Sequence, residues 1–237
     1  MSKITVDVAD SIATITLRRP ATLNALTAEG DSTSIDTRDD VLVTVWQATG
    51  KWFCAGTDVR ASGTPREGDL NLRDSFVQGI VRTTTDCGQA LYSHSKILVA
   101  ALNGPVMYAN CIVAEGGSSV TFVNRMGLAK ANEVLIWGKK KEAQELYECG
   151  FINKILPLQS TESFHAAIRA ILFEELRGLD PTALLVVKRL LRAGLTEKNN
   201  PDAANLRESY AQAERFASGI PGKQFLRIAR KEIKHKL

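Results

Sequence analysis

The sequence predicts an α/β fold, with a first half rich in strands and a helical second half. Apolar and polar residues alternate through residues 4–8 and 12–17, and apolar β-branched runs follow at 41–47 and 96–106. From residue 118 onward, apolar residues recur with helical spacing. The 237 residues can bury a sizeable core, in one large domain or two small ones.

The first two alternating runs predict a β-hairpin, with residues 9–11 as the connection. The sequence Arg-Arg-Pro ends the second strand, because proline cannot donate a hydrogen bond to the ladder. The run VLVTVWQ at 41–47 predicts a buried strand. KILVAALNGPV at 96–106 predicts another strand, which ends at Asn-Gly-Pro.

Loops and helices follow these strands. Residues 61–74 are polar and predict a loop, whereas residues 75–92 show mixed helical spacing. FINKILP at 151–157 predicts a short strand. The segments predicted to be helical are 118–128, 129–137, 141–149, 161–176, 181–194 and 201–217.

Composition argues against several classes of protein. The apolar fraction of 44% and charged fraction of 24% are those of a soluble globular protein. A net charge of +4 suits an anionic small ligand but is too small to indicate a nucleic-acid partner. We expect no membrane span and no signal peptide, and therefore an intracellular protein. The four cysteines lack metal-ligand spacing, so we expect neither a metal site nor a disulfide framework.

The stretch VAEGGSS at 113–119 places Glu115 between a short apolar run and two glycines. Glycines leave room for a ligand to approach, and apolar neighbours raise the pKa of a carboxyl group toward the range useful for proton transfer. The alternative is an exposed glutamate in a surface turn. From this stretch alone the surface turn is favoured, because most charged side chains are solvated.

Four segments occur in a distinctive order: ITLRRPATLNALT, VLVTVWQATGKWFCAGTDVR, KILVAALNGPV, and AEGGSSVTFVNRMG with the residues after it up to about Pro157. In this order they resemble the enoyl-CoA hydratase/isomerase (crotonase) family. The second segment resembles the family's buried strand and its Phe-x-Ala-Gly-x-Asp loop. Ala-Glu-Gly-Gly-Ser-Ser and the Lys-Leu terminus look most like fungal peroxisomal Δ3,Δ2-enoyl-CoA isomerases.

The resemblance implies a crotonase-like ββα spiral at residues 1–157 and a C-terminal helical region at 158–237. It also implies a homotrimer or hexamer, because this helical region packs on neighbouring subunits in the family. The implied substrate is an unsaturated acyl-CoA of fatty acid β-oxidation. Coenzyme A is then part of the substrate, and no separate cofactor and no metal are expected.

The implied activity is that of a Δ3,Δ2-enoyl-CoA isomerase, which stabilises an enolate while a double bond moves. Two backbone N–H groups hold the negative charge of the thioester oxygen, and Thr57 matches one of these donors. Glu115 matches the base that takes a proton from C2 and returns it to C4. With the resemblance counted, the catalytic interpretation of Glu115 is favoured over the surface turn. The residues that would line the CoA arm are Ala55, Gly56, Thr57, Asp58 and Val59.

Two departures from the family matter. Only residues 107–113 stand between NGPV and AEGGSS, where the family has several dozen residues that include a second N–H donor and a buried helix. The family's long first helix is reduced to the polar stretch at 31–40. We therefore expect impaired activity and two strands that lose a covering layer, with Met107 or Tyr108 as the remaining candidate donors. The alternatives are an inactive crotonase-like protein that binds CoA or assembles with intact relatives, and an enoyl-CoA hydratase.

Three further features have two interpretations or a weak signal. Cys54 has no histidine nearby in the sequence and is predicted to be a buried thiol rather than a nucleophile. The lysines at 139–141 either meet CoA phosphates or lie at a solvated helix junction. The C-terminal residues His235, Lys236 and Leu237 are close to the Ser-Lys-Leu peroxisomal address, so we expect a peroxisomal protein that binds the import receptor.

Overall fold

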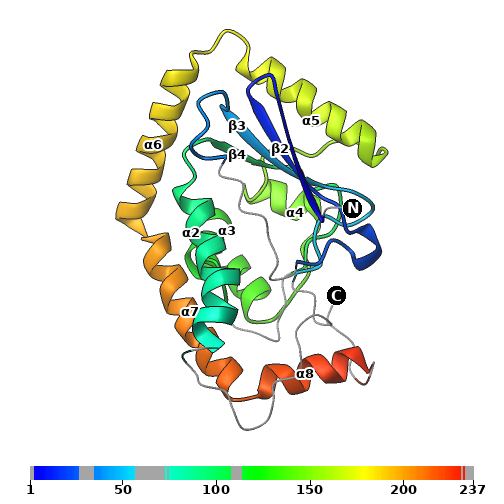
Figure 1. Ribbon diagram of the computed structural model, residues 1–237, viewed down its shortest axis with the longest axis vertical. Coiled ribbons are helices and arrows are strands. Elements are labelled where there is room, and N and C mark those ends of the chain that lie inside the picture. The colour runs from blue at the N-terminus through cyan, green and yellow to red at the C-terminus, as the bar shows by residue number, and fades with distance from the viewer. Residues whose placement is uncertain are drawn as a thin grey trace. The chain divides into compact units, whose positions relative to one another are not determined.

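The computed structural model of the chain describes residues 3–26, 35–56, 73, 75–107, 114–230 and 232 (Figure 1). These residues form two compact units, and each unit is assembled from three segments. The first unit comprises Met1–Asp58, His94–Met107 and Leu156–Glu197, and the second comprises Val59–Ser93, Tyr108–Ile155 and Lys198–Leu237. The division expected at residue 157 stays a prediction. The predicted loop at 61–74 lies almost entirely outside the described residues.

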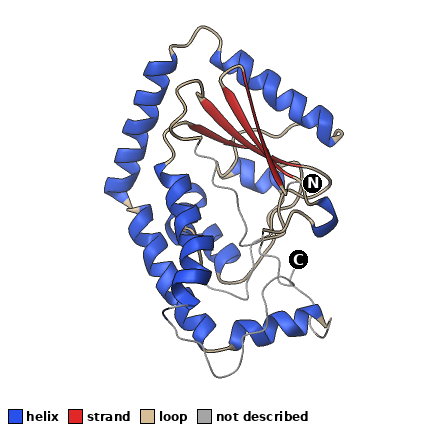
Figure 2. Cartoon of the chain, viewed as in Figure 1, coloured by secondary structure: helices blue, strands red, loops and turns tan. Residues whose placement is uncertain are grey.

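The first unit contains a sheet, drawn in red in Figure 2. It has four strands in the order β1-β2-β3-β4. Strands β1 (Ile4–Ala9) and β2 (Ile12–Leu17) form the predicted antiparallel hairpin. Strand β3 (Val43–Ala48) runs parallel to β2, and β4 (Ile97–Ala100) runs parallel to β3. The prediction of these four strands from apolar patterning is confirmed.

The core of the first unit lies between this sheet and two helices, α5 (Thr161–Leu176) and α6 (Pro181–Lys198). Val43 and Val45 are buried because alternate side chains of β3 point to the same face of the sheet. The helical residues that pack on this face are Phe164, Ile168, Leu172, Leu176, Leu184 and Leu185. Burial of apolar surface, at about 25 cal/mol for each Å², therefore fixes the two helices on the strands.

The exposure of side chains on β3 and β4 bears on the expectation that these two strands lose a covering layer. Thr44 on β3 is buried, whereas its neighbour Leu98 on β4 is 38% exposed. Val106, which follows β4, is also exposed. Thr44 is covered because the ring of His94 lies against it, with His94 Nε2 2.9 Å from Thr44 Oγ1. The expected loss of a covering layer stays a prediction, and the exposed side chains of Leu98 and Val106 agree with it on the β4 side.

The second unit is helical in its described residues. Its elements are η2 (Ser75–Thr85, a π-helix), α2 (Asp86–Ser93), α3 (Ser118–Leu135), α4 (Ala143–Glu148), α7 (Pro201–Ala217) and α8 (Ile220–Ala229). The two helices predicted at 118–128 and 129–137 appear as α3 with a break at Gly127, where φ is 74° and ψ is 160°. The helix at 201–217 is confirmed, and Asn200 caps it by accepting a hydrogen bond from the N–H of Ala203.

The structure differs from the sequence-based assignments at one predicted strand and contains one helix that was not predicted. Residues 151–157 form no strand, because the N–H groups of Phe151 and Ile152 donate to the carbonyl of Leu146 and close the C-terminal end of α4. Phe151 then packs edge-on against Phe122 with ring centroids 5.2 Å apart. Helix α8 was not predicted from the sequence.

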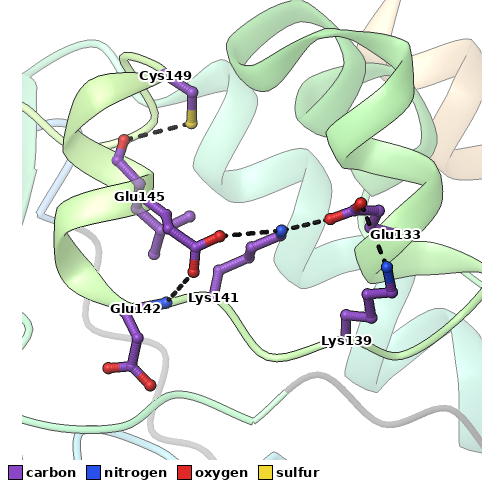
Figure 3. A network of polar contacts seen from close by, with 7 residues as sticks. Glu133, Lys139, Lys141, Glu142, Glu145 and Cys149 are labelled. Carbon is purple, nitrogen blue, oxygen red and sulfur yellow. Dashed lines mark hydrogen bonds and ion pairs between the residues drawn. The ribbon is translucent and has the colours of Figure 1, made fainter.

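An ion-pair network joins the end of α3 to the start of α4 (Figure 3). The ammonium group of Lys141 lies between the carboxylates of Glu133 and Glu145, and it is 3.2 Å from the latter. Lys139 pairs with Glu133 at 3.3 Å. Of the two interpretations of this lysine run, the structure favours the helix junction, because two of the lysines already have carboxylate partners.

Candidate active site

A glycine turn carries Glu115 into the N-terminus of α3. Gly116 and Gly117 have φ of 63° and 75°, a left-handed conformation that side chains with a Cβ rarely adopt. The N–H of Ser118 donates to the carbonyl of Glu115, and the N–H of Glu115 donates to Ser118 Oγ, both at 3.2 Å. The backbone on both sides of the carboxyl-bearing residue is therefore fixed.

A carboxylate from α7 caps this turn. Glu208 is buried, and its two oxygens accept hydrogen bonds from the N–H groups of Gly117 at 2.7 Å and Ser119 at 2.8 Å. The first N–H groups of a helix have no partner within the helix, and a negative charge there is favourable. Glu208 thus holds the turn that positions Glu115.

The glycines of this turn serve different purposes. The hydroxyl of Tyr92 donates to the carbonyl of Gly116 and lies 3.1 Å from Thr121 Oγ1. A Cβ on Gly117 would lie 2.1 Å from that hydroxyl oxygen, whereas a Cβ on Gly116 would meet nothing within 4 Å. The space beside Gly117 is therefore taken by Tyr92, and only Gly116 borders open space.

Alanine substitutions should separate these two purposes. Gly116→Ala should lower the free energy of unfolding by about 1–2 kcal/mol, the cost of a left-handed conformation for a residue with a Cβ. Gly117→Ala should lower the free energy of unfolding by about 1–3 kcal/mol more than Gly116→Ala does, because the added Cβ also overpacks against Tyr92. Urea unfolding of both variants checks this, and equal losses would contradict the role of Tyr92.

The carboxyl group of Glu115 is half-buried and has polar neighbours from two elements, η2 and α7. Gln212 Nε2 on α7 donates to Glu115 Oε2 at 3.0 Å, and Thr84 on η2 also hydrogen-bonds the carboxyl group. Burial raises the pKa of Glu115, the hydrogen bond from Gln212 opposes that rise, and the charge of Glu208 adds to it. A carboxyl group with a raised pKa in this setting can both accept and return a proton more readily than an exposed glutamate.

In the first unit, Asn24 organises the segment that leads to Ala55 and Gly56. Its side chain is buried and donates to the carbonyls of Thr49 at 2.8 Å and Trp52 at 2.7 Å. Its Oδ1 accepts a hydrogen bond from the N–H of Arg19. One side chain therefore ties the Asn-Ala-Leu motif to the chain just before the predicted CoA loop.

Backbone N–H groups next to this loop already donate hydrogen bonds to backbone carbonyls. The N–H of Ala55 donates to the carbonyl of Leu23 at 2.9 Å, and the N–H of Met107 donates to the carbonyl of Cys54 at 3.0 Å. Met107, a candidate for the second oxyanion donor, therefore has its N–H committed to the adjacent segment. Tyr108 and the predicted site residues Thr57, Asp58 and Val59 lie outside the described residues.

Two other reactive-looking groups are structural. Cys54 is buried, and burial raises the pKa of its thiol, so it is a poor nucleophile as the sequence predicts. His94 lies 2.9 Å from Thr44 Oγ1 and 3.3 Å from Asp36, which imitates a nucleophile–histidine–acid triad. Thr44 is only 1% exposed, however, so no substrate reaches its hydroxyl.

Neither a metal cluster nor a spanning helix occurs in the part of the chain that the structure describes. No group of three or more His, Cys, Asp or Glu side chains there could hold a metal ion. No helix there is long and apolar enough to cross a membrane.

Comparison with known proteins places the chain in a family. It is 32% identical to a Δ(3,5)-Δ(2,4)-dienoyl-CoA isomerase of Pyricularia oryzae over 277 alignment positions, which cover 98% of each chain. The chain belongs to the enoyl-CoA hydratase/isomerase (crotonase) family. The alignment is longer than the 237 residues of this chain, so the relative carries residues that this crotonase-family member lacks.

Further relatives agree with the predicted family and fold. A 3,2-trans-enoyl-CoA isomerase of Saccharomyces cerevisiae is 27% identical over 94% of this chain and 92% of its own. A peroxisomal enoyl-CoA delta isomerase 3 of mouse is 25% identical over 87% of this chain and 72% of its own. An enoyl-CoA hydratase/isomerase structure from Pseudoalteromonas atlantica superposes with a TM-score of 0.72 over the whole of both chains at 19% identity. No profile of a known protein family matches the sequence.

The predicted crotonase α/β fold and the predicted enoyl-CoA isomerase kinship are therefore confirmed. The sequence-based interpretation missed the side chains that surround Glu115, namely Tyr92, Glu208 and Gln212. A signal for two of them existed, because α7 carries polar residues at 205, 208, 209 and 212, a spacing that places them on one helical face.

Proposed function

We propose that this crotonase-family chain is a Δ3,Δ2-enoyl-CoA isomerase in which Glu115 carries the proton. The observation that supports this most is the setting of Glu115: a half-buried carboxyl group with a raised pKa, on a turn fixed from both sides. A double-bond shift needs one group that removes a proton and then returns it, and a single carboxylate does both.

The reaction follows from this placement. The ionised carboxylate of Glu115 takes a proton from C2 of a 3-enoyl-CoA, and the electron pair of the broken C–H bond becomes part of an enolate. Backbone N–H groups, with Thr57 as the proposed first donor, hold the charge on the thioester oxygen. The thioester carbonyl then re-forms, the C1–C2 electron pair of the enolate moves between C2 and C3, and the electron pair of the C3–C4 double bond takes the proton from Glu115 at C4. The proposed CoA-lining residues are Ala55, Gly56, Thr57, Asp58 and Val59.

A second candidate is the isomerisation of 3,5-dienoyl-CoA to 2,4-dienoyl-CoA. It is favoured by the 32% identity to a relative that bears this name. The first proton transfer, from C2 to Glu115, is the same, but the proton is added at C6 in place of C4. C6 lies two carbons further from C2 than C4 does, so the second candidate shares Glu115 for the step at C2 and needs a second proton-donating group beside C6.

A direct assay distinguishes these activities. The purified chain is given 3-enoyl-CoA, 3,5-dienoyl-CoA and 2-enoyl-CoA in turn, and the products are separated by chromatography. Formation of 2-enoyl-CoA supports the first candidate, and formation of 2,4-dienoyl-CoA supports the second. Formation of 3-hydroxyacyl-CoA would instead indicate a hydratase. Binding of a CoA ester with no turnover of any of the three would refute both candidates and favour a CoA-binding or assembly partner.

We also infer that the chain is peroxisomal and enters through His235, Lys236 and Leu237. A mouse relative of the same family bears the word peroxisomal in its name, and the terminus is close to a known address. A fluorescent fusion with this C-terminus should accumulate in peroxisomes, and deletion of Leu237 should leave it in the cytosol. Retained import of the truncated fusion would show that another signal or a partner carries it.

The oligomeric state inferred for the chain is a homotrimer or hexamer, by analogy with the family's helical C-terminal region. Apolar side chains on α6 are exposed and could be covered in such an assembly. They are Val186, Val187, Leu190, Leu191 and Leu195. Light scattering at micromolar concentration tests this, and a monomer would count against it.

A further inference from the structure

One face of α7 is lined by buried polar side chains. Asn205, Glu208, Ser209 and Gln212 are each at most 7% exposed and follow one another at helical spacing. The buried face of a helix usually carries apolar residues, and a buried polar group costs free energy unless it is hydrogen-bonded. Such a face is stable only where its polar groups find hydrogen-bond partners.

The partners of this polar face lead from η2 to Glu115. Asn205 Nδ2 donates to the carbonyl of Thr85 at 2.9 Å, and Ser209 Oγ lies 2.7 Å from Thr85 Oγ1. These contacts set the position of α7 against η2 within the second unit (Figure 1). On the same face of α7, Glu208 holds the N-terminus of α3, and Gln212, one turn beyond Glu208, reaches the carboxyl group of Glu115.

We propose that Gln212 is a positioning residue for the base: its amide orients the carboxyl group of Glu115, while Glu208 holds the turn from which that group projects. This inference rests on the proposed function, because it assumes that Glu115 carries the proton. Gln212 lies four positions after Glu208 on one helix, so α7 acts on the side chain and on the backbone of the same site.

The amide of Gln212 can hydrogen-bond the carboxyl group of Glu115 in both of its protonation states. Gln212 Nε2 donates to the ionised carboxylate. Gln212 Oε1 is buried and has no hydrogen-bond partner among the described residues, so it can accept from the protonated carboxyl group after a rotation of the amide. A glutamate or a lysine at this position would favour only one of the two states.

The groups that face Glu115 determine in which direction a substitution should move the pKa of Glu115. They are Thr84 from η2, Cys87 from α2, and Glu208 and Gln212 from α7. Desolvation of the thiol near Glu115, and then the charge of Glu115, raises the pKa of Cys87, although the residue as a whole is exposed, so Cys87 stays neutral. Glu208 is then the charged neighbour that raises the pKa of Glu115, and Gln212 is a donor that lowers it.

Two substitutions should therefore move the titration of Glu115 in opposite directions. Gln212→Met, which keeps the volume but removes the donor, should raise the pKa of Glu115 by about one unit, the equivalent of one hydrogen bond to a charged group. Glu208→Gln should lower that pKa, because it removes a like charge. Gln212→Asn draws the amide back from the carboxylate, retains a polar side chain, and should act in the direction of Gln212→Met.

The experiment is a pH titration of protein labelled with ¹³C at the glutamate carboxyl carbon, followed by NMR, with Glu115→Gln to identify the signal. Gln144→Met is the matched control, because Gln144 donates to Glu148 at 3.1 Å on the exposed surface of α4. It should leave the titration of Glu115 unchanged. In the active protein, the acidic limb of kcat/KM should move with the NMR value, to higher pH in Gln212→Met.

The outcomes are separable. An unmoved Glu115 signal in Gln212→Met, or in Gln212→Asn if the first variant does not fold, overturns the role of Gln212. A moved signal with turnover that survives Glu115→Gln overturns the proposed function while the contact between Gln212 and Glu115 stands. Equal shifts in Gln212→Met and Gln144→Met would also overturn the inference, because the effect would not be local.

Discussion

Glu115→Gln should lower the turnover of 3-enoyl-CoA by about 10²–10⁴-fold, the usual contribution of a positioned general base. The amide has the shape of the carboxyl group but cannot take a proton from C2. Binding of the CoA ester should change little, because the substitution removes an interaction made in the transition state. The measurement is kcat and KM from initial rates, together with the dissociation constant of a saturated acyl-CoA. Unchanged turnover would remove Glu115 from the mechanism.

A matched control is available on α5. Glu174 is exposed and pairs with Arg177, so Glu174→Gln makes the same chemical change away from the site. It should leave turnover unchanged. A similar loss in both variants would indicate a general effect of the lost charge rather than the loss of a base.

Glu115→Gln should also stabilise the folded chain at neutral pH. Because the pKa of Glu115 is raised on folding, the ionised group disfavours the folded state, and this cost grows as pH rises from the ordinary glutamate pKa to the raised value. Above the raised pKa the cost is constant, and below the ordinary pKa it is absent. Glu115→Gln should therefore unfold at a higher urea concentration than the parent at neutral pH but not in acid. An advantage that persists in acid would have another origin.

The sequence predicts the sheet of the first unit well because its signals are local. Alternation in β1 and β2 and the apolar run of β3 depend on neighbouring residues alone, and so does the proline that ends the hairpin. The strand predicted at residues 151–157 is wrong because its N–H groups are used to end α4, and composition does not reveal that use. Apolar content alone could not distinguish a strand at residues 151–157 from a segment that ends a helix.

The sequence predicts the candidate site only in part, and again only where the signal is local. The motif around Glu115 marks the proposed base and its glycine turn, because both lie within a few residues of one another. Gln212 reaches Glu115 across 97 residues of sequence, and Glu208 reaches Gly117 across 91. Such contacts are set by how α7 packs within its unit, so a single sequence shows only that α7 carries polar residues on one face.

Restoring the missing internal segment should raise turnover by roughly 10²–10³-fold, the usual worth of one oxyanion donor. In the family this segment lies between the counterparts of Met107 and Ala114, and it supplies the second N–H to the thioester oxygen. The N–H of Met107 is committed to the carbonyl of Cys54, so it cannot replace that donor without breaking the bridge between residues 54 and 106. The parent chain would then hold the enolate with one donor.

The segment should also cover apolar surface, which gives the test a second readout. Leu98 and Val106 are 38% and 52% exposed, and a restored helix and strand over this edge would bury them at about 25 cal/mol for each Å². The chimera should therefore gain both turnover of 3-enoyl-CoA and resistance to urea. A gain in stability without turnover would show that the segment restores packing but not the donor. Full activity in the parent chain would contradict the hypothesis, and it would place a substitute N–H donor among residues 108–113.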